Sequence, residues 1–206
     1  GRKREEAFRA GGEGTKTALD TDAYDEYYKH LILWDKQKNK VVGAYRLGYG
    51  KEILEKRGVK GLYTRSLFDY EPEFHHVLKQ SIELGRSFVS VEYQKEALPL
   101  MLLIKGLLYS VLNVPDVKYL IGPVSISAWY PKFYQSLIIE YLRNNHSVEK
   151  MEKMMKPRNP FFTDFHRSNP KYLLGAAKAD SIEKFDRYML KLSDGEYRLP
   201  TLVKKY

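Results

Sequence analysis

The chain has 206 residues, 43% of them hydrophobic, and a formal net charge of +9 from 35 Lys and Arg against 26 Asp and Glu. This length predicts one domain with a sizeable core. The lack of cysteine excludes a disulfide scaffold, a thiolate metal site and a cysteine nucleophile. The basic charge either serves solubility alone or favours an acidic partner, such as nucleic acid, anionic lipid or an acidic protein.

Strands and helices alternate along the first two thirds of the chain. Residues 2–10 predict a charged helix that ends at a Gly-Gly pair. Two strand-like stretches, 27–35 and 41–49, flank the polar turn KQKNK and predict a hairpin. The stretches that follow predict a helix at 52–58, a strand at 61–70, a helix at 71–80, a strand at 81–94, an apolar helix at 97–112 and a strand at 117–127. This alternation predicts an α/β or α+β sheet covered by helices.

The last third of the chain is more basic and is interrupted by prolines. Residues 130–145 predict an amphipathic helix, and the stretch 143–171 carries 7 Lys and Arg against 3 Asp and Glu. A last helix is expected at 180–192 with Asp180 as its N-cap. We therefore predict a single domain over residues 1–206, with a core at 1–145 and a basic helical and loop extension at 146–206. Because the sequence starts at Gly1, we expect it to be a piece of a longer chain.

Charged residues inside the predicted strands need partners, because such residues are almost never fully buried unless they are paired. Arg46 shares a strand face with Val42 and Ala44, so we expect a carboxylate beside it, either Glu83 or the acidic stretch 20–26. In a regular strand Glu83 and Arg86 point to opposite faces. The two side chains share a face only if a β-bulge lies between them.

No metal site is predicted. The acidic stretch DTDAYDEYY has Asp25 where a calcium loop requires glycine, so it predicts a solvated turn or a pocket for an amine. His75 and His76 are adjacent in a predicted helix and therefore face different directions.

Four short motifs occur in the order of one known family. They are Arg4-x-x-x-Phe8, Asp22-x-x-Asp25, Gly43-x-x-Arg46-Leu47 and Glu83-x-x-Arg86. This series resembles the hemolysin-like N-acyltransferases that make ornithine and glycine lipids in bacteria, especially the Bacteroidetes type, and the related acyl-homoserine-lactone synthases. Both groups have the GNAT acetyltransferase fold. The resemblance thus implies a mixed, mostly antiparallel sheet with helices on both faces.

The resemblance also implies the transfer of a long-chain (3-hydroxy)acyl group from a carrier-protein thioester to the amine of glycine or ornithine. Glu83 would then take a proton from the attacking ammonium through a water. Arg46 or Arg86 would hold the carboxylate of the acceptor. Backbone N–H groups at Phe88, Val89 and Ser90 would bind the thioester oxygen.

The other site residues follow from the same resemblance. Asp22 and Asp25 would order Arg4, or meet the amine, and Arg4 and Phe8 would lie over the acceptor pocket. Ser125 and Ser127 would hydrogen-bond the pantetheine arm, or only cap the strand end. The acyl chain would lie over Leu103, Leu107 and Ile126.

The stretch QKEALPL, residues 94–100, lacks the glycines that bind the pyrophosphate of coenzyme A at a helix N-terminus. This favours an acyl carrier protein, with its 4'-phosphopantetheine thioester, over acyl-CoA as the donor, and implies no tightly bound cofactor. We expect a cytoplasmic location. Peripheral contact with an anionic membrane through the basic, Phe-rich segment 150–172 is an alternative use of the charge.

Three other functions fit the sequence less well. Lactone synthesis is disfavoured because AGGEGT stands where the synthases have a tryptophan. Acylation of a lysophospholipid commonly uses His-x-x-x-x-Asp, and no aspartate stands five residues after His75 or His76. A nucleic-acid-binding module fits the charge, but the sequence has no RRM, KH or helix-turn-helix signature.

Overall fold

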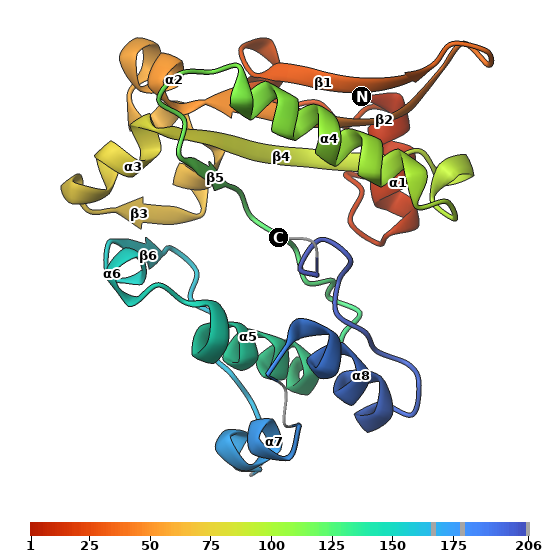
Figure 1. Cartoon of the computed structure of the whole chain (residues 1–206), viewed down its shortest axis with the longest axis vertical. Helices are drawn as coiled ribbons and strands as arrows, with labels where there is room; N and C mark the ends of the chain where they lie inside the picture. Colours follow the sequence, from red (N-terminus) through yellow and green to blue (C-terminus); the bar gives the residue numbers. More distant parts are fainter. Residues whose placement is uncertain (166–167, 178–179, 205–206) are drawn as a thin grey trace. The chain divides into compact units, whose positions relative to one another are not determined.

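The computed structural model describes residues 1–165, 168–177 and 180–204 (Figure 1). It has two compact units, Gly1–Pro123 with Lys153–Arg158, and Val124–Glu152 with Asn159–Tyr206. The predicted division into a core at 1–145 and an extension at 146–206 stays a prediction. The first unit contains α1 (Arg2–Ala10), η1 (Ala23–Glu26), β1 (Lys29–Asp35), β2 (Lys40–Tyr49), α2 (Gly50–Arg57), η2 (Val59–Gly61), η3 (Tyr63–Ser66), β3 (Phe68–Tyr70), η4 (Pro72–Phe74), α3 (His75–Lys79), β4 (Ser81–Val89), η5 (Val91–Tyr93), α4 (Leu98–Leu112), β5 (Tyr119–Ile121) and β6 (Met155–Pro157).

The main sheet of the first unit has the strand order β1-β2-β4-β5. The pairs β1–β2 and β2–β4 are antiparallel, and β5 returns parallel to β4 after the crossover helix α4. This confirms the predicted mixed, mostly antiparallel sheet. β5 pairs only with Ser81–Glu83, so in the described part of the chain the later half of β4 has no strand beside it on that edge. The predicted strand 117–127 is therefore correct over three residues only.

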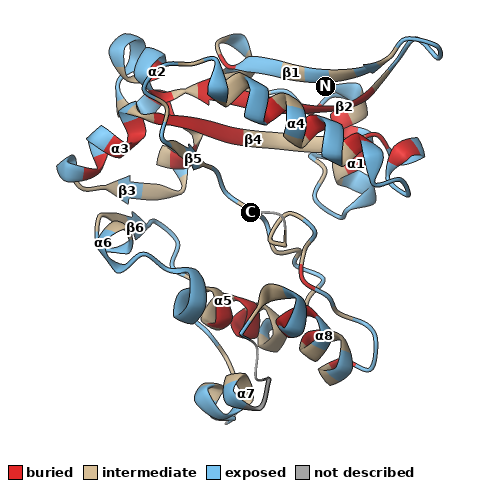
Figure 2. Cartoon of the chain, in the orientation of Figure 1, coloured by how far each residue is buried: buried red, intermediate tan, exposed pale blue. Residues whose placement is uncertain are grey.

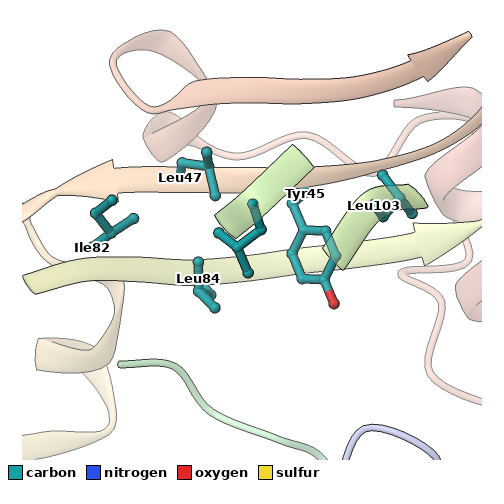
Figure 3. Packing of buried hydrophobic residues seen from close by; sticks show 6 residues of the cluster. Tyr45, Leu47, Ile82, Leu84 and Leu103 are labelled. Atoms are coloured by element: carbon teal, nitrogen blue, oxygen red, sulfur yellow. The ribbon is translucent and has the colours of Figure 1, made fainter. Parts of the chain in front are cut away.

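The two faces of this sheet have different chemistry. On one face, Leu103 and Leu107 of the apolar helix α4 pack onto Tyr45, Leu47, Ile82 and Leu84, as Figure 3 shows. On the opposite face the alternation of the strands places Arg46 and Glu83, near α1 and η1. The first half of β4 is buried and its second half is half-buried (Figure 2).

The loop after α1 is held by the carboxylate of Glu5, which is buried. It accepts hydrogen bonds from the Thr15 hydroxyl at 2.7 Å and from the backbone N–H groups of Thr15 and Lys16, both at 2.9 Å. Arg9 adds an ion pair at 2.9 Å. The Thr15 hydroxyl is the main cause that lowers the pKa of Glu5 to about 2, although burial opposes it.

We expect this loop to be acid-sensitive. The folded state binds the Glu5 proton more weakly than the unfolded chain does, so the stability that it contributes is complete above about pH 4.3 and is lost as the pH falls through 2. The free energy of unfolding, measured in urea between pH 5 and pH 2, should fall more steeply for the wild type than for Glu5→Gln. Equal slopes would contradict this role of Glu5.

In the first unit, one predicted strand was mostly wrong and one observed strand was missed. Residues 61–70 form a strand only at Phe68–Tyr70, because the backbone before it turns to donate N–H groups to Glu83. Strand β6 was not predicted. It consists of only three residues and depends on its pairing with the distant strand β3, which local periodicity does not reveal.

The second unit is helical. It contains α5 (Lys132–His146), α6 (Glu149–Glu152), α7 (Pro170–Ala177) and α8 (Ile182–Leu192). The rings of Tyr141 and Phe185 stack at 3.8 Å in its core. The N-cap of α8 is Ser181 and not Asp180, whose carboxylate instead pairs with Lys184 at 2.7 Å. Across the described ranges, no helix has both the length and the apolar character that crossing a membrane requires.

Candidate active site

A β-bulge in β4 places the side chains of Glu83 and Arg86 on the same face of the sheet, although a regular strand would point them to opposite faces. Arg46 of β2 pairs with Gly85, but Ala44 pairs with Phe88, so β4 has one extra residue between the two pairs. Arg86 lies in this bulge with a φ of 49°, which is uncommon for a residue with a side chain. The extra residue brings the side chain of Arg86 to the face that carries Glu83. The predicted condition for a shared face is thereby met.

Arg46 is paired with the acidic stretch, one of the two alternatives that the sequence left open. Its side chain is 1% exposed, and Nη1 donates to Asp22 Oδ1 at 2.5 Å and to Asp25 Oδ1 at 3.1 Å. Its guanidinium also lies 5.2 Å from the ring centroid of Tyr28 and 5.5 Å from that of Tyr24. A buried cation with two carboxylates and aromatic neighbours is held in one position.

Arg4 joins helix α1 to the same carboxylates. Its guanidinium binds Asp25 in a bidentate manner, at 2.9 Å and 2.7 Å, and its Nε lies 3.0 Å from Asp20 Oδ2. Burial by itself would raise the pKa of Asp25, but the hydrogen bonds from Arg4, the Asp22 backbone and Arg46 together hold it below the usual range. Asp25 thus orders Arg4 as the resemblance implies.

Arg86 is the most accessible of the three arginines. Its side chain is 27% exposed, and its ion pairs are looser, 3.3 Å to Asp22 Oδ2 and 3.7 Å to Asp20 Oδ2. The guanidinium lies 5.9 Å from the ring of Phe8. Because Arg86 is held least tightly, it can exchange a carboxylate partner most easily.

Glu83 lies beside this charged cluster, but its hydrogen bonds are to other groups. Its carboxylate is buried and accepts the backbone N–H groups of Tyr63, at 2.9 Å to Oε2, and of Thr64, at 2.7 Å to Oε1. The hydroxyl of Tyr28 also donates to Oε2. The carboxylate therefore holds the 3-10 turn Tyr63–Ser66 in place and is itself fixed in orientation.

Several buried polar atoms at this site have no hydrogen-bond partner among the described residues. They include the Nε atoms of Arg4, Arg46 and Arg86 and the carboxylate oxygens of Asp20, of which Oδ2 still forms an ion pair with Arg4 Nε at 3.0 Å. Unpaired buried polar atoms are rare in native proteins and need an explanation, such as a bound polar ligand or a water. Their position among three arginines and three aspartates is suited to a small zwitterion.

Three of the residues expected to bind the donor, Phe88, Val89 and Ser90, lie at the C-terminal end of β4, after Arg86 of the bulge. The backbone N–H of Ser90 donates a hydrogen bond to the carbonyl oxygen of Val42 at 2.8 Å. The Ser90 hydroxyl donates to the carbonyl oxygen of Val41, also at 2.8 Å. Because successive N–H groups of a strand point to opposite edges, that of Val89 points away from β2. The Val89 carbonyl accordingly accepts a side-chain hydrogen bond from Gln94 at 3.0 Å.

Ser125 and Ser127 belong to the second unit, and so does Ile126. The hydroxyl of Ser127 accepts the N–H of Trp129 at 3.3 Å, a capping contact. Leu103 and Leu107 are fully buried in the core of the first unit. A role of these residues in binding the donor stays a prediction.

The sequence motifs missed three members of the site. Asp20 is completely buried between Arg4 and Arg86, and its place in the acidic stretch was the only signal. Tyr28 and Tyr63 contact Glu83 through a hydroxyl and a backbone N–H, and no sequence pattern marks such contacts. In the ranges that the structure describes, no group of three or more His, Asp or Glu side chains is arranged to hold a metal ion.

Comparisons with known proteins agree with this geometry. Residues 4–104 match the family described as acetyltransferase (GNAT) domain. The chain is 31% identical over its whole length to a glycine N(alpha)-acyltransferase of Bacteroides thetaiotaomicron, and 35% identical over 78% of its length to one of Phocaeicola vulgatus. It spans 63% and 52% of those two proteins, respectively. No solved structure matches the chain.

The family match over residues 4–104 includes all six charged motif residues. The hairpin, the bulged strand and the parallel β5 agree with a GNAT fold. Residues 4–104 thus match the acetyltransferase (GNAT) domain family, and the chain is similar to two bacterial glycine N-acyltransferases.

Proposed function

We propose that the protein transfers a long acyl group from a carrier-protein thioester to the amine of a small amino acid, with glycine as the first candidate and ornithine as the second, in aminolipid synthesis. One observation supports this most. Arg46, Glu83 and Arg86 converge on one sheet face, beside a strand edge that no strand among the described residues covers. The two homologues are named for acyl transfer to glycine.

Each group has a distinct part in the proposed reaction. Arg86 binds the carboxylate of the acceptor, while Arg46 and Arg4 hold Asp22 and Asp25 in place beside it. Glu83 receives one proton from the acceptor ammonium through a water. The neutral amine then attacks the thioester carbonyl, the Val89 N–H stabilises the oxyanion, and the thiol departs with the second amine proton as the amide forms.

A carrier protein is the proposed donor, rather than coenzyme A, for a local reason. The N-terminus of α4 has Ala97 as its N-cap without a side-chain cap, and Pro99 in its first turn removes one of the free N–H groups. Such a helix end offers a diphosphate fewer hydrogen bonds than a glycine-rich turn does. The +9 charge would attract an acidic carrier protein.

The direct test is a panel of amino acids with acyl-carrier-protein and acyl-CoA donors, read by product mass. We expect an N-acyl amino acid, with glycine preferred, and a KM for the carrier protein that rises with ionic strength. An ester product would support lysophospholipid acylation instead, and a lactone would support homoserine-lactone synthesis. If the protein forms no amide from any donor, the proposal fails.

A peripheral membrane contact is a further proposal, and helix α4 supports it. Its outer face exposes Leu98, Met101, Leu102, Leu108, Tyr109 and Leu112. These side chains follow helical spacing, and the only charge among them is that of Lys105. A wide apolar stripe with a central lysine and no carboxylate fits an anionic lipid surface, which accepts both leucine side chains and a lysine that extends to the headgroups. The segment 150–172 is the alternative; residues 166 and 167 of it lie outside the described residues.

We expect the protein to float with vesicles that contain phosphatidylglycerol and to stay unbound with phosphatidylcholine alone. Leu102→Glu combined with Leu108→Glu should lower binding at least about tenfold, because each change replaces an exposed apolar side chain that would insert into the lipid with a carboxylate that the anionic headgroups repel. Leu19→Glu is the matched control, since Leu19 is also exposed but lies outside α4. Unchanged flotation of the double variant, or a dimer lost on mutation, would assign this face to another partner.

A further inference from the structure

Tyr28 is a buried tyrosine whose hydroxyl is committed to Glu83. Tyr28 lies between η1 and β1, immediately before Lys29, and is 5% exposed. Its hydroxyl donates to Glu83 Oε2 and accepts the N–H of Tyr63 at 3.0 Å. A second acceptor, Gly61 O, is 3.5 Å away, but the hydroxyl of Tyr27 already donates to it at 2.8 Å. A hydroxyl has only one proton to donate, so that of Tyr28 goes to Glu83.

The environment keeps that proton on the tyrosine. Burial, and then the charge of the neighbouring Glu83, raise the pKa of Tyr28 far above its usual value. The Tyr28 hydroxyl therefore keeps its proton at neutral pH and can donate it to Glu83. Glu83 Oε2 thus has two donors, from Tyr28 and Tyr63, whereas Oε1 has only the Thr64 N–H. Oε1 is the oxygen with more free acceptor capacity.

Gly48 provides the space that the Tyr28 ring occupies. It lies on β2 directly opposite Glu83 of β4. A Cβ at this position would lie 2.7 Å from Cζ and 2.9 Å from Cδ1 of Tyr28, and closer still to Cε1. Its backbone is not in the left-handed region, so space and not conformation requires glycine here. Any side chain at position 48 would push the ring, and with it the hydroxyl, away from Glu83.

We propose that Tyr28 is a positioning residue of the acyl-transfer site and that Gly48 is the residue that admits it. Tyr28 and the Tyr63 N–H hold Oε2, which leaves Oε1 of Glu83 to accept the proton of the acceptor. This inference rests on the proposed function, in which Glu83 is the base. It adds two residues that none of the four sequence motifs contains.

The test compares kcat and KM for glycine in Tyr28→Phe, Gly48→Ala, Glu83→Gln and the double variant Tyr28→Phe/Glu83→Gln. A misoriented base should lower kcat of Tyr28→Phe about ten- to a hundredfold, with little change in KM. Gly48→Ala should reproduce this loss although it leaves the tyrosine in the chain. In the Glu83→Gln background, adding Tyr28→Phe should lower kcat by a further factor of less than about two, because the two residues act as one unit.

Tyr93→Phe is the matched control. Tyr93 is also a buried tyrosine, and its hydroxyl also donates to a carboxylate, Asp35, at 3.0 Å. The kcat of Tyr93→Phe should stay near that of the wild type. Melting temperatures will show that each variant is folded. If Tyr28→Phe retains the kcat of Tyr93→Phe while Glu83→Gln is impaired, the positioning role is refuted and the proposed function stands. An inactive wild type refutes both.

Discussion

Glu83→Gln is expected to lower kcat for acyl transfer by about 10²–10⁴-fold at saturating glycine and donor, the usual contribution of a general base. Glutamine keeps the size of the side chain but does not accept a proton. Its amide NH2 would also face one of the donors, from Tyr28, Tyr63 or Thr64, that hold the carboxylate. The unmatched donor should cost about 1–3 kcal/mol of stability.

The loss of rate must therefore be separated from a loss of folded protein. The folded fraction at the assay temperature comes from a thermal melt of each variant. Glu92→Gln serves as the control, since Glu92 is exposed and forms an ion pair with Lys40 at 3.1 Å, away from Glu83. A rate of Glu83→Gln within about threefold of the wild type would remove Glu83 from the base role.

Arg46→Met should produce the largest loss of stability in the charged cluster. Methionine has a similar length but leaves Asp22 and Asp25 without their buried cation. Removing one partner of a buried ion pair typically costs about 3–5 kcal/mol, because the remaining charges stay desolvated. Asp25 would keep Arg4 at 2.7 Å, whereas Asp22 would keep only its looser ion pair with Arg86 at 3.3 Å and therefore bears more of the effect. Urea denaturation at neutral pH measures this free energy of unfolding.

Arg65→Met is the comparison for an exposed pair. Arg65 lies 2.5 Å from Asp69, but the Asp69 side chain is 54% exposed and also has Arg158 as a partner at 3.0 Å. We expect a loss of at most about 1 kcal/mol there. If Arg46→Met loses no more than Arg65→Met, the buried cluster does not hold the fold together, and its charges serve ligand binding alone.

The pairing of Arg46 illustrates how far the sequence predicts the site. Its place between Val42 and Ala44 on a strand face required a carboxylate partner, and the structure supplies Asp22 and Asp25. The sequence left Glu83 as an equal candidate, because local patterns do not report which distant segment folds over a sheet face. The turn η1 made that choice, through the capping box between Asp22 and Asp25.

The helices α1, α4 and α5, the hairpin and the central strand β4 can be predicted from local sequence, because each has a period or a stop signal within its own residues. The bulge at Arg86, the contact of Tyr28 with Glu83 and the space that Gly48 leaves for it depend on how distant segments pack. These features arise where β2, β4 and the segment after η1 meet. Packing between distant segments sets the geometry of the site, whereas local sequence sets only the elements that carry it.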